Sequence, residues 1–149
     1  MLKSLLKRSI NRIIDANINR TKEGLRVCEE IARFILNSRS LTLDFKKNRH
    51  RIEAILKRLP NRTTLIKERE SLSDVGKDIT LSELKRRNYR DIFFANIQRV
   101  KESIRVLEEF TKLINKDIAL EFKKTRYLIY EIEKKGIAKI TSFKSRRKP

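Results

Sequence analysis

Helix-breaking and disulfide-forming residues are scarce in this sequence. Its 149 residues include three glycines, two prolines, one cysteine, one histidine and no tryptophan. So little glycine and proline excludes collagen-like and Pro/Gly-rich disordered classes, and it lets long helices form without interruption. One cysteine and one histidine exclude an internal disulfide and a structural zinc site.

Long uncharged stretches are missing as well. Charged residues make up 38% of the chain, and they interrupt every apolar run before it reaches the roughly 18 residues that a membrane span needs. The start, MLKSLLKRSINRII, lacks the apolar core and the small-residue cleavage site of a secretory signal. We therefore expect one cytoplasmic domain that does not cross a membrane.

Acidic residues are few compared with basic ones. The 38 lysines and arginines outnumber the 19 aspartates and glutamates, which leaves a formal net charge of +19. Such a surplus suits nucleic acid phosphates, an anionic membrane surface or small anionic substrates. Because the charge is spread along the whole chain and is only somewhat denser in residues 144–148, it does not by itself choose among these partners.

The sequence contains an internal repeat. Residues 16–33 and 95–112 are identical at 10 of 18 aligned positions, and residues 43–56 and 120–133 at 7 of 14. In both copies apolar residues recur three or four positions apart, which is typical of a helix with one buried face. Each copy therefore predicts a helix, a short turn and a second helix.

Two such hairpins predict an all-α fold. We expect an antiparallel helical bundle in which the two hairpins are related by a pseudo-two-fold axis and joined by an irregular central connection. The expected divisions are repeat one at about 10–58, the connection at 59–89, repeat two at about 90–135, a single domain over 1–137 and a basic C-terminal tail at 138–149.

Polar and helix-breaking residues mark the ends of the expected helices. Turns are predicted at residues 37–40 and 115–117. Within the connection we expect a short helix at residues 64–69 and another that begins at Thr80. Gly136 is predicted to cap the last helix, with no regular helix after it.

The repeat keeps one set of polar residues at steps of three. They are Asn17, Arg20, Glu23 and Arg26 in the first copy and Asn96, Arg99, Glu102 and Arg105 in the second. Steps of three drift by about 60° around a helix, so we expect a semi-buried row beside the apolar stripe. The row could form ion pairs within each helix, but arginine rather than lysine in both copies favours bidentate contact with carboxylate or phosphate.

Three other features have a structural and a functional interpretation. Gly76 lies between Asp74 and Asp78 in a segment that could be an ordinary Asx-type turn or a mobile phosphate or metal loop. Cys28 lies on the apolar stripe and is predicted to be a core residue. His50 aligns with a tyrosine in the other copy and is predicted to be packed rather than catalytic. The chain has no Gly-rich phosphate-binding motif, so any phosphate site must be built from side chains.

Four strings, in this order, carry a family resemblance: DANINRTKEGLRVCEEIARF, KNRHRI, SDVGKDI and FANIQRVKESIRVLEEF. From about Ile13 to Ile132 the chain resembles the alternative hydroxymethylpyrimidine phosphate kinase family of thiamine biosynthesis, a domain often fused N-terminal to thiamine-phosphate synthase. Lys77 departs from the pattern, because the resemblance leads us to expect a small hydroxyl residue after Gly76. We therefore assign no hydroxyl contact to phosphate at that position.

The resemblance implies a kinase that converts hydroxymethylpyrimidine phosphate to its diphosphate, with ATP as co-substrate and Mg²⁺ as cofactor. The chain has no room for a barrel of about 250 residues, so it is not by itself a thiamine-phosphate synthase. The roles that we give to its residues are hypotheses from the chemistry of phosphoryl transfer. The candidates are Arg20, Arg99, Glu23 and Glu102 for catalysis, Asn17, Asn96, Arg26, Arg105, Arg49, Arg126, Asp74 and Gly76 for substrate or phosphate, and Glu23, Glu102 and Asp74 for Mg²⁺.

Two functions of other classes stay open. The first is a non-catalytic partner or regulatory domain of thiamine-phosphate synthase, which would explain the fusion that the resemblance implies. The second is a nucleic-acid-binding helical domain, which is disfavoured because only 7% of the residues are aromatic and no helix shows a one-sided Lys/Arg stripe. The expected partners are thus small anionic substrates and a thiamine-phosphate synthase, with a homo-oligomer left open.

Overall fold

The scarcity of helix breakers results in four long helices. The computed structural model describes residues 1–60, 62–78 and 81–146, except for the side chains of residues 144–146. The elements are α1 (Leu2–Glu30), the π-helical turn η1 (Ile31–Ile35), α2 (Arg39–Leu56), α3 (Arg62–Lys67), the 3-10 turn η2 (Leu81–Leu84), α4 (Tyr89–Thr111) and α5 (Lys116–Arg146). No strand occurs in the described ranges, so the prediction of an all-α fold is confirmed.

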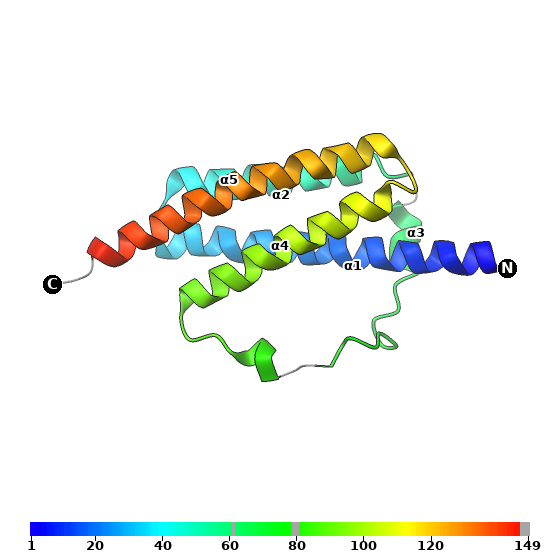
Figure 1. Cartoon of the computed structure of the whole chain (residues 1–149), viewed down its shortest axis with the longest axis horizontal. Helices are drawn as coiled ribbons and strands as arrows, with labels where there is room; N and C mark the ends of the chain where they lie inside the picture. The colour runs from blue at the N-terminus through cyan, green and yellow to red at the C-terminus, as the bar shows by residue number, and fades with distance from the viewer. Residues whose placement is uncertain (61, 79–80, 147–149) are drawn as a thin grey trace.

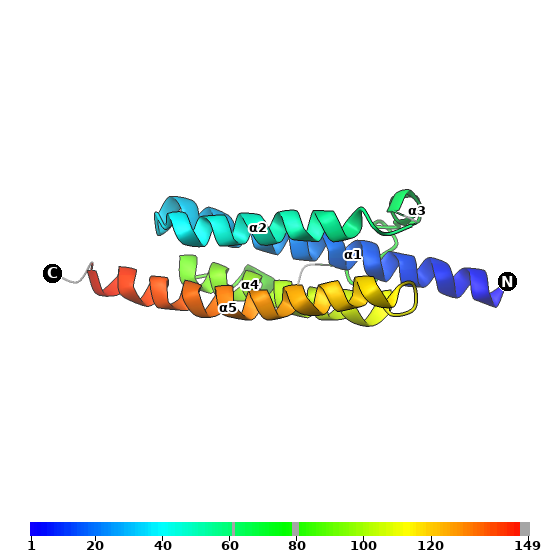
Figure 2. The same ribbon diagram turned by 90° about the horizontal axis from the view of Figure 1, so that it is seen from above.

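The long helices form an antiparallel four-helix bundle. Helices α1 and α5 each pack against both α2 and α4. Figures 1 and 2 show α1 and α2 as one hairpin and α4 and α5 as the other. In the part of the chain that the structure describes, no helix is long and apolar enough to cross a membrane.

A pseudo-two-fold axis lies where α1 crosses α4. The repeat places Thr21 opposite Val100 in the alignment, and Gly24 opposite Ser103. In the structure the Thr21 hydroxyl lies 2.6 Å from the Ser103 hydroxyl, while Gly24 lies against Val100. These two contacts exchange under a two-fold rotation, so they confirm that the hairpins are related as predicted.

Gly24 allows α1 to approach α4 closely. A Cβ at this position would lie 2.6 Å from Cγ2 of Val100 and 3.1 Å from the carbonyl oxygen of Asn96. We expect Gly24→Val to lower the free energy of unfolding by about 1–3 kcal/mol, because the helices must separate. Denaturant unfolding measures the effect, and Gly76→Val is the control, since a Cβ there meets only the side chain of Asp74 at 3.4 Å. Equal stability of the Gly24 variant and the wild type would contradict this account of the crossing.

The core is built from the apolar stripes and confirms the prediction for Cys28. Fully buried rings include Phe45, Phe93 and Phe122, and the first two meet edge to face with centroids 6.2 Å apart. Cys28 is completely buried, and burial raises the pKa of its thiol to about 12. His50 is exposed, so the prediction that it is packed is wrong: the neighbouring Arg49 turns toward α1 instead.

Both turns lie close to the polar residues that predict them, but residues 39–40 and 116–117 of the predicted turns already belong to α2 and α5. Asn37 has a positive φ of 49°, and the Ser38 hydroxyl caps α2 by accepting from the Leu41 amide. Asn115 caps α5 by accepting from the amides of Asp117 and Ile118. The two short elements of the connection are α3 and η2, while Thr80, predicted to begin the second, lies outside the described residues.

The predicted end of the last helix at Gly136 is wrong. Helix α5 continues to Arg146, so the predicted boundary between domain and tail at residues 137/138 falls inside it. Gly136 is buried within α5, and a Cβ there would lie 2.6 Å from the ring of Phe93. Farther on, Phe143 meets Tyr89 edge to face with centroids 6.3 Å apart. The glycine therefore makes room for an aromatic ring instead of capping the helix.

Candidate functional site

One side of the bundle, formed by α1 and α4, is not covered by the other long helices. Lys22 pairs with Glu53 of α2, and Lys101 pairs with Glu133 of α5 at 2.7 Å, so these lysines mark the covered sides. Residues two positions earlier point about 200° away around the helix. Arg20 and Arg99 thus lie on the opposite, open side, and both are exposed.

The asparagines of the repeat anchor this open face in the same way in both copies. The side-chain amides of Asn17 and Asn96 donate to the carbonyl oxygens of Ile13 and Ile92, each at 2.8 Å. Asn17 is 5% exposed, and its amide oxygen accepts from the Arg20 guanidinium at 3.4 Å. The prediction of a semi-buried row therefore holds for the asparagines, whereas the arginines and glutamates of the row are exposed.

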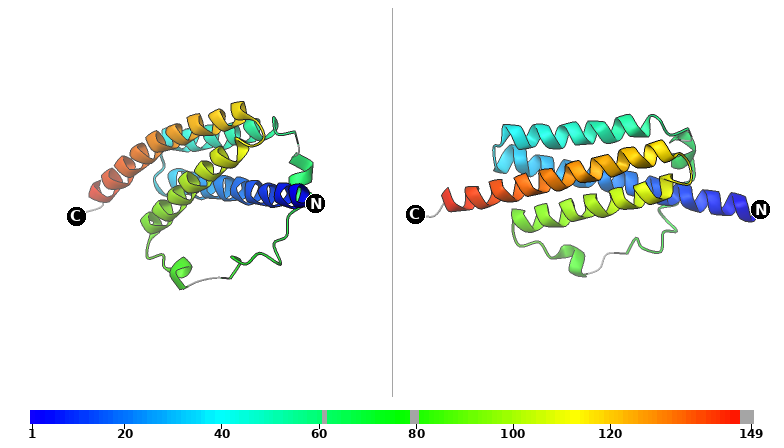
Figure 3. Two further views of the ribbon diagram at one scale, coloured as in Figure 1. Left: turned by 45° about the vertical axis from the view of Figure 1, so that its right-hand side comes forward. Right: turned by 45° about the horizontal axis from the view of Figure 1, so that its top comes forward.

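The connection between α3 and α4 lies on the side of α1 and α4 that faces away from α2 and α5, and there it bows outward from the helices (Figures 1 and 3). We call its first part, residues 70–78, the strap. Just before the strap, both nitrogens of the Arg69 fork donate to the Asp15 carboxylate, at 2.6 and 2.7 Å. One residue earlier, Glu68 accepts from the Asn11 amide at 3.0 Å. These contacts hold the start of the strap on α1.

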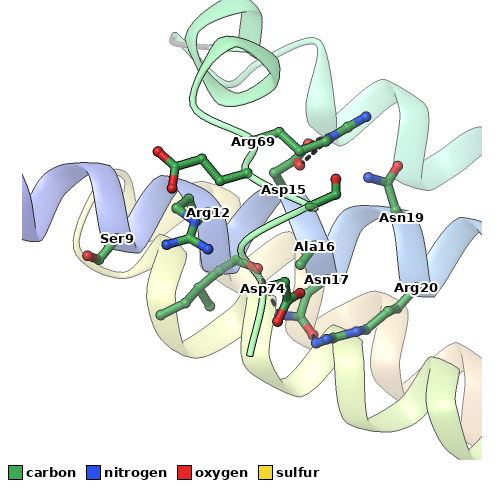
Figure 4. Close-up of a pocket in the computed structure, with 12 residues that line it drawn as sticks. Ser9, Arg12, Asp15, Ala16, Asn17, Asn19, Arg20, Arg69 and Asp74 are labelled. Atoms are coloured by element: carbon green, nitrogen blue, oxygen red, sulfur yellow. Dashed lines mark hydrogen bonds and ion pairs between the residues drawn. The ribbon is translucent and has the colours of Figure 1, made fainter. Parts of the chain in front are cut away.

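A pocket of about 420 Å³ lies between α1 and the strap (Figure 4). Of the residues predicted from the sequence to form a site, the pocket gathers Asn17, Arg20 and Asp74. Its remaining lining residues are Ser9, Arg12, Ile13, Asp15, Ala16, Asn19, Arg69, Glu70 and Ser71. Among the described residues, neither Arg12 nor Arg20 has a carboxylate partner, so two guanidinium groups are available to an anionic ligand.

Asp74 lies on the strap above Asn17 and Arg20 (Figure 4). Its carboxylate accepts from the Gly76 amide at 2.8 Å, which is the hydrogen bond of the expected Asx-type turn. The turn and a ligand role are compatible, because a carboxylate has two oxygens and about four acceptor positions. Gly76 itself does not line the pocket.

The second copy does not bring its residues to this pocket. Asn96, Arg99 and Glu102 lie on α4 and are not among the lining residues. The exposed Glu102 accepts from Gln98 at 3.0 Å, and Glu23 is exposed on α1. Across the described ranges, no group of three or more His, Cys, Asp or Glu side chains could hold a metal ion. The structure therefore does not gather the three Mg²⁺ candidates.

The other four predicted arginines hold two buried glutamates in equivalent networks. Arg49 and Arg26 lie 3.3 and 3.1 Å from Glu29, and in the second copy Arg126 and Arg105 lie 2.9 and 3.2 Å from Glu108. Burial raises the pKa of Glu108, but its two arginines outweigh burial, so that the pKa lies below its usual value. This arrangement favours a structural role for these arginines.

The chain matches a known protein family and is similar to several curated proteins. Residues 12–135 match the model of the ThiD2 family. Three curated relatives are described as thiamine-phosphate synthase: those of Rhodopirellula baltica (40% identical, covering 83% of this chain and 33% of the relative), Nostoc punctiforme (36%, 88% and 36%) and Synechocystis sp. (37%, 84% and 35%). The chain thus spans about a third of the length of these relatives. No solved structure matches it.

Proposed function

The chain belongs to the ThiD2 family, a domain of thiamine biosynthesis, and from this premise we propose that it is an ATP-dependent hydroxymethylpyrimidine phosphate kinase. The observation that carries the proposal is the pocket in which Arg12 and Arg20, both without carboxylate partners in the described residues, flank the strap residue Asp74. A pocket with two available guanidinium groups suits a phosphorylated substrate.

The proposed reaction needs positioning more than proton transfer. An oxygen of the pyrimidine phosphate attacks the γ-phosphorus of ATP, the bond from that phosphorus to the β–γ bridging oxygen breaks, and ADP leaves with its electron pair. The attacking oxygen is already anionic, so no strong general base is required. The barrier arises from bringing two polyanions together, and fixed cations such as Arg12 and Arg20 lower it.

The pocket fits a magnesium ion that arrives on the nucleotide phosphates. In such sites Mg²⁺ is held by one or two carboxylates together with substrate phosphates and water. The pocket has two carboxylates on the strap, Asp74 and Glu70, and we propose Asp74 as the principal one. The bound ion would neutralise charge on the transferred phosphoryl group.

The test is product formation by the purified chain alone. With ATP, Mg²⁺ and hydroxymethylpyrimidine phosphate, we expect equal amounts of ADP and the pyrimidine diphosphate, detected by phosphorus NMR or mass spectrometry. Omitting the pyrimidine phosphate is the control, because ADP that arises by phosphoryl transfer, and not by hydrolysis of ATP, forms only when the acceptor is present. A folded protein that forms no diphosphate with any metal or nucleotide donor would remove the kinase proposal.

A second candidate is a partner or regulatory domain of thiamine-phosphate synthase. The observation that favours it is that curated relatives about three times longer than the matched region carry that name. Thermal melting separates the candidates, because a ligand that binds the folded state raises the melting temperature. Stabilisation by ATP with Mg²⁺ or by the pyrimidine phosphate supports the kinase. Stabilisation only by a synthase supports the partner domain, and stabilisation by duplex DNA at low salt alone supports the disfavoured nucleic-acid function.

A further inference from the structure

The pseudo-symmetry of the bundle is broken at the pocket. The alignment of the repeats pairs Arg12 with Asp91 and Asp15 with Phe94. Asp91 accepts from Arg87 at 3.1 Å near the start of its own helix. The second copy therefore has an acid where the first has the cation Arg12, and an aromatic ring where the first has the acid Asp15. Only the first copy therefore has an acid at the position where Asp15 binds Arg69, the residue just before the strap.

In the part of the chain that the structure describes, no ion pair joins the strap itself to the bundle. Residues 70–78 are exposed, and in the described residues their hydrogen bonds stay within the strap: Ser73 donates to Glu70, Gly76 to Asp74 and Lys77 to Leu72. The last contact to the bundle before them is therefore the Arg69 to Asp15 pair. Asp74 follows five residues after Arg69, so the point at which Arg69 is attached limits how far Asp74 can lie from α1.

The geometry of this pair suits a fixed attachment. The Asp15 side chain is 8% exposed, which shields the charge from solvent, and the guanidinium fork binds both carboxylate oxygens. A bidentate pair fixes orientation as well as distance, which a single lysine contact does not. Asp15 and Arg69 both line the pocket, together with Asn17 and Asp74, so the attachment is made at the pocket itself.

We infer that the Asp15–Arg69 pair is a latch that positions the strap, and thereby Asp74, over Asn17 and Arg20. The inference rests on the proposed function for its kinetic consequence. Asp15 and Arg69 act through Asp74 and are positioning residues. They also distinguish the two halves of the repeat. In this proposal the first half binds the reacting phosphates, whereas the second half has Phe94 in place of Asp15 and cannot form the same ion pair.

The experiment uses the full chain with Asp15→Asn, which keeps the shape of the side chain and removes its charge, and with Arg69→Lys, which keeps the charge and removes the fork. Asp44→Asn is the matched control, because Asp44 forms an ion pair of similar length, 2.6 Å, with Lys135 away from the strap. Spin labels at Ser73→Cys on the strap and Lys46→Cys on α2 report where the strap lies. Cys28 is buried, so it stays unlabelled.

We expect both latch variants to broaden the distribution of distances between the labels and to lower kcat/KM by about tenfold or more, as misplaced catalytic groups do. The control variant should match the wild type in both measurements. A distance distribution that stays as narrow as the control overturns the latch. Broadening without any loss of turnover overturns its role in positioning. If the wild type forms no diphosphate, the proposed function fails while the distances still decide the latch.

Discussion

Replacing Arg20 with lysine is expected to lower kcat/KM for phosphoryl transfer by about 10-fold to 100-fold while the melting temperature changes by no more than about 2 °C. Arg20 is exposed, and among the described residues its guanidinium hydrogen-bonds only to Asn17, so the fold depends little on it. Lysine keeps the positive charge but loses the planar fork that binds two phosphate oxygens at once. Steady-state kinetics and thermal melting measure the two effects separately.

The same substitution at Arg99 tests whether the second half of the repeat takes part. Arg99 is exposed on the open face but does not line the pocket, so we expect a reduction in turnover that is smaller than for Arg20. Arg126→Lys is the matched control, because Arg126 holds the buried Glu108 and should affect melting more than turnover. Full turnover in both Arg20→Lys and Arg99→Lys would show that the arginines of the row are structural.

The repeat and the hairpins can be predicted from the sequence because both depend on local periodicity. Apolar residues at three- and four-residue spacings identify the buried stripes, and polar residues such as Ser38 and Asn115 mark the turns. The prediction that Gly136 ends the last helix is wrong because the role of this glycine is not local. Its role depends on a ring from a distant helix, Phe93, and no local pattern separates a capping glycine from one that makes room for a neighbour.

Only some of the residues that line the pocket can be predicted from the sequence. Asn17 and Arg20 stand out because the repeat keeps them, whereas Arg12, Asp15 and Arg69 are not repeated and belong to no periodic pattern. The signal that could have found the first two is the difference between the copies, since Arg12 and Asp15 are replaced by residues of other charge. Arg69 pairs with an acid 54 positions away, which only the folded chain brings within reach.

Removing the charge of Asp74 is expected to have the second large effect. Asp74→Asn keeps an oxygen that can accept from the Gly76 amide, so the turn that the structure shows at 2.8 Å can persist. The carboxylate charge that would hold Mg²⁺ is lost. We therefore expect turnover to fall by about 100-fold, the Mg²⁺ concentration for half-maximal rate to rise, and the melting temperature to stay nearly constant.

The control for Asp74 lies on the same strap. Asp78 is also exposed but does not line the pocket, so Asp78→Asn removes an equal charge from the strap without changing the proposed metal ligand. A general electrostatic effect of strap charge would lower turnover equally in both variants, whereas a ligand role predicts loss in the Asp74 variant alone. A turn residue without a ligand role would show the reverse order, with melting temperature reduced and the Mg²⁺ dependence of turnover unchanged.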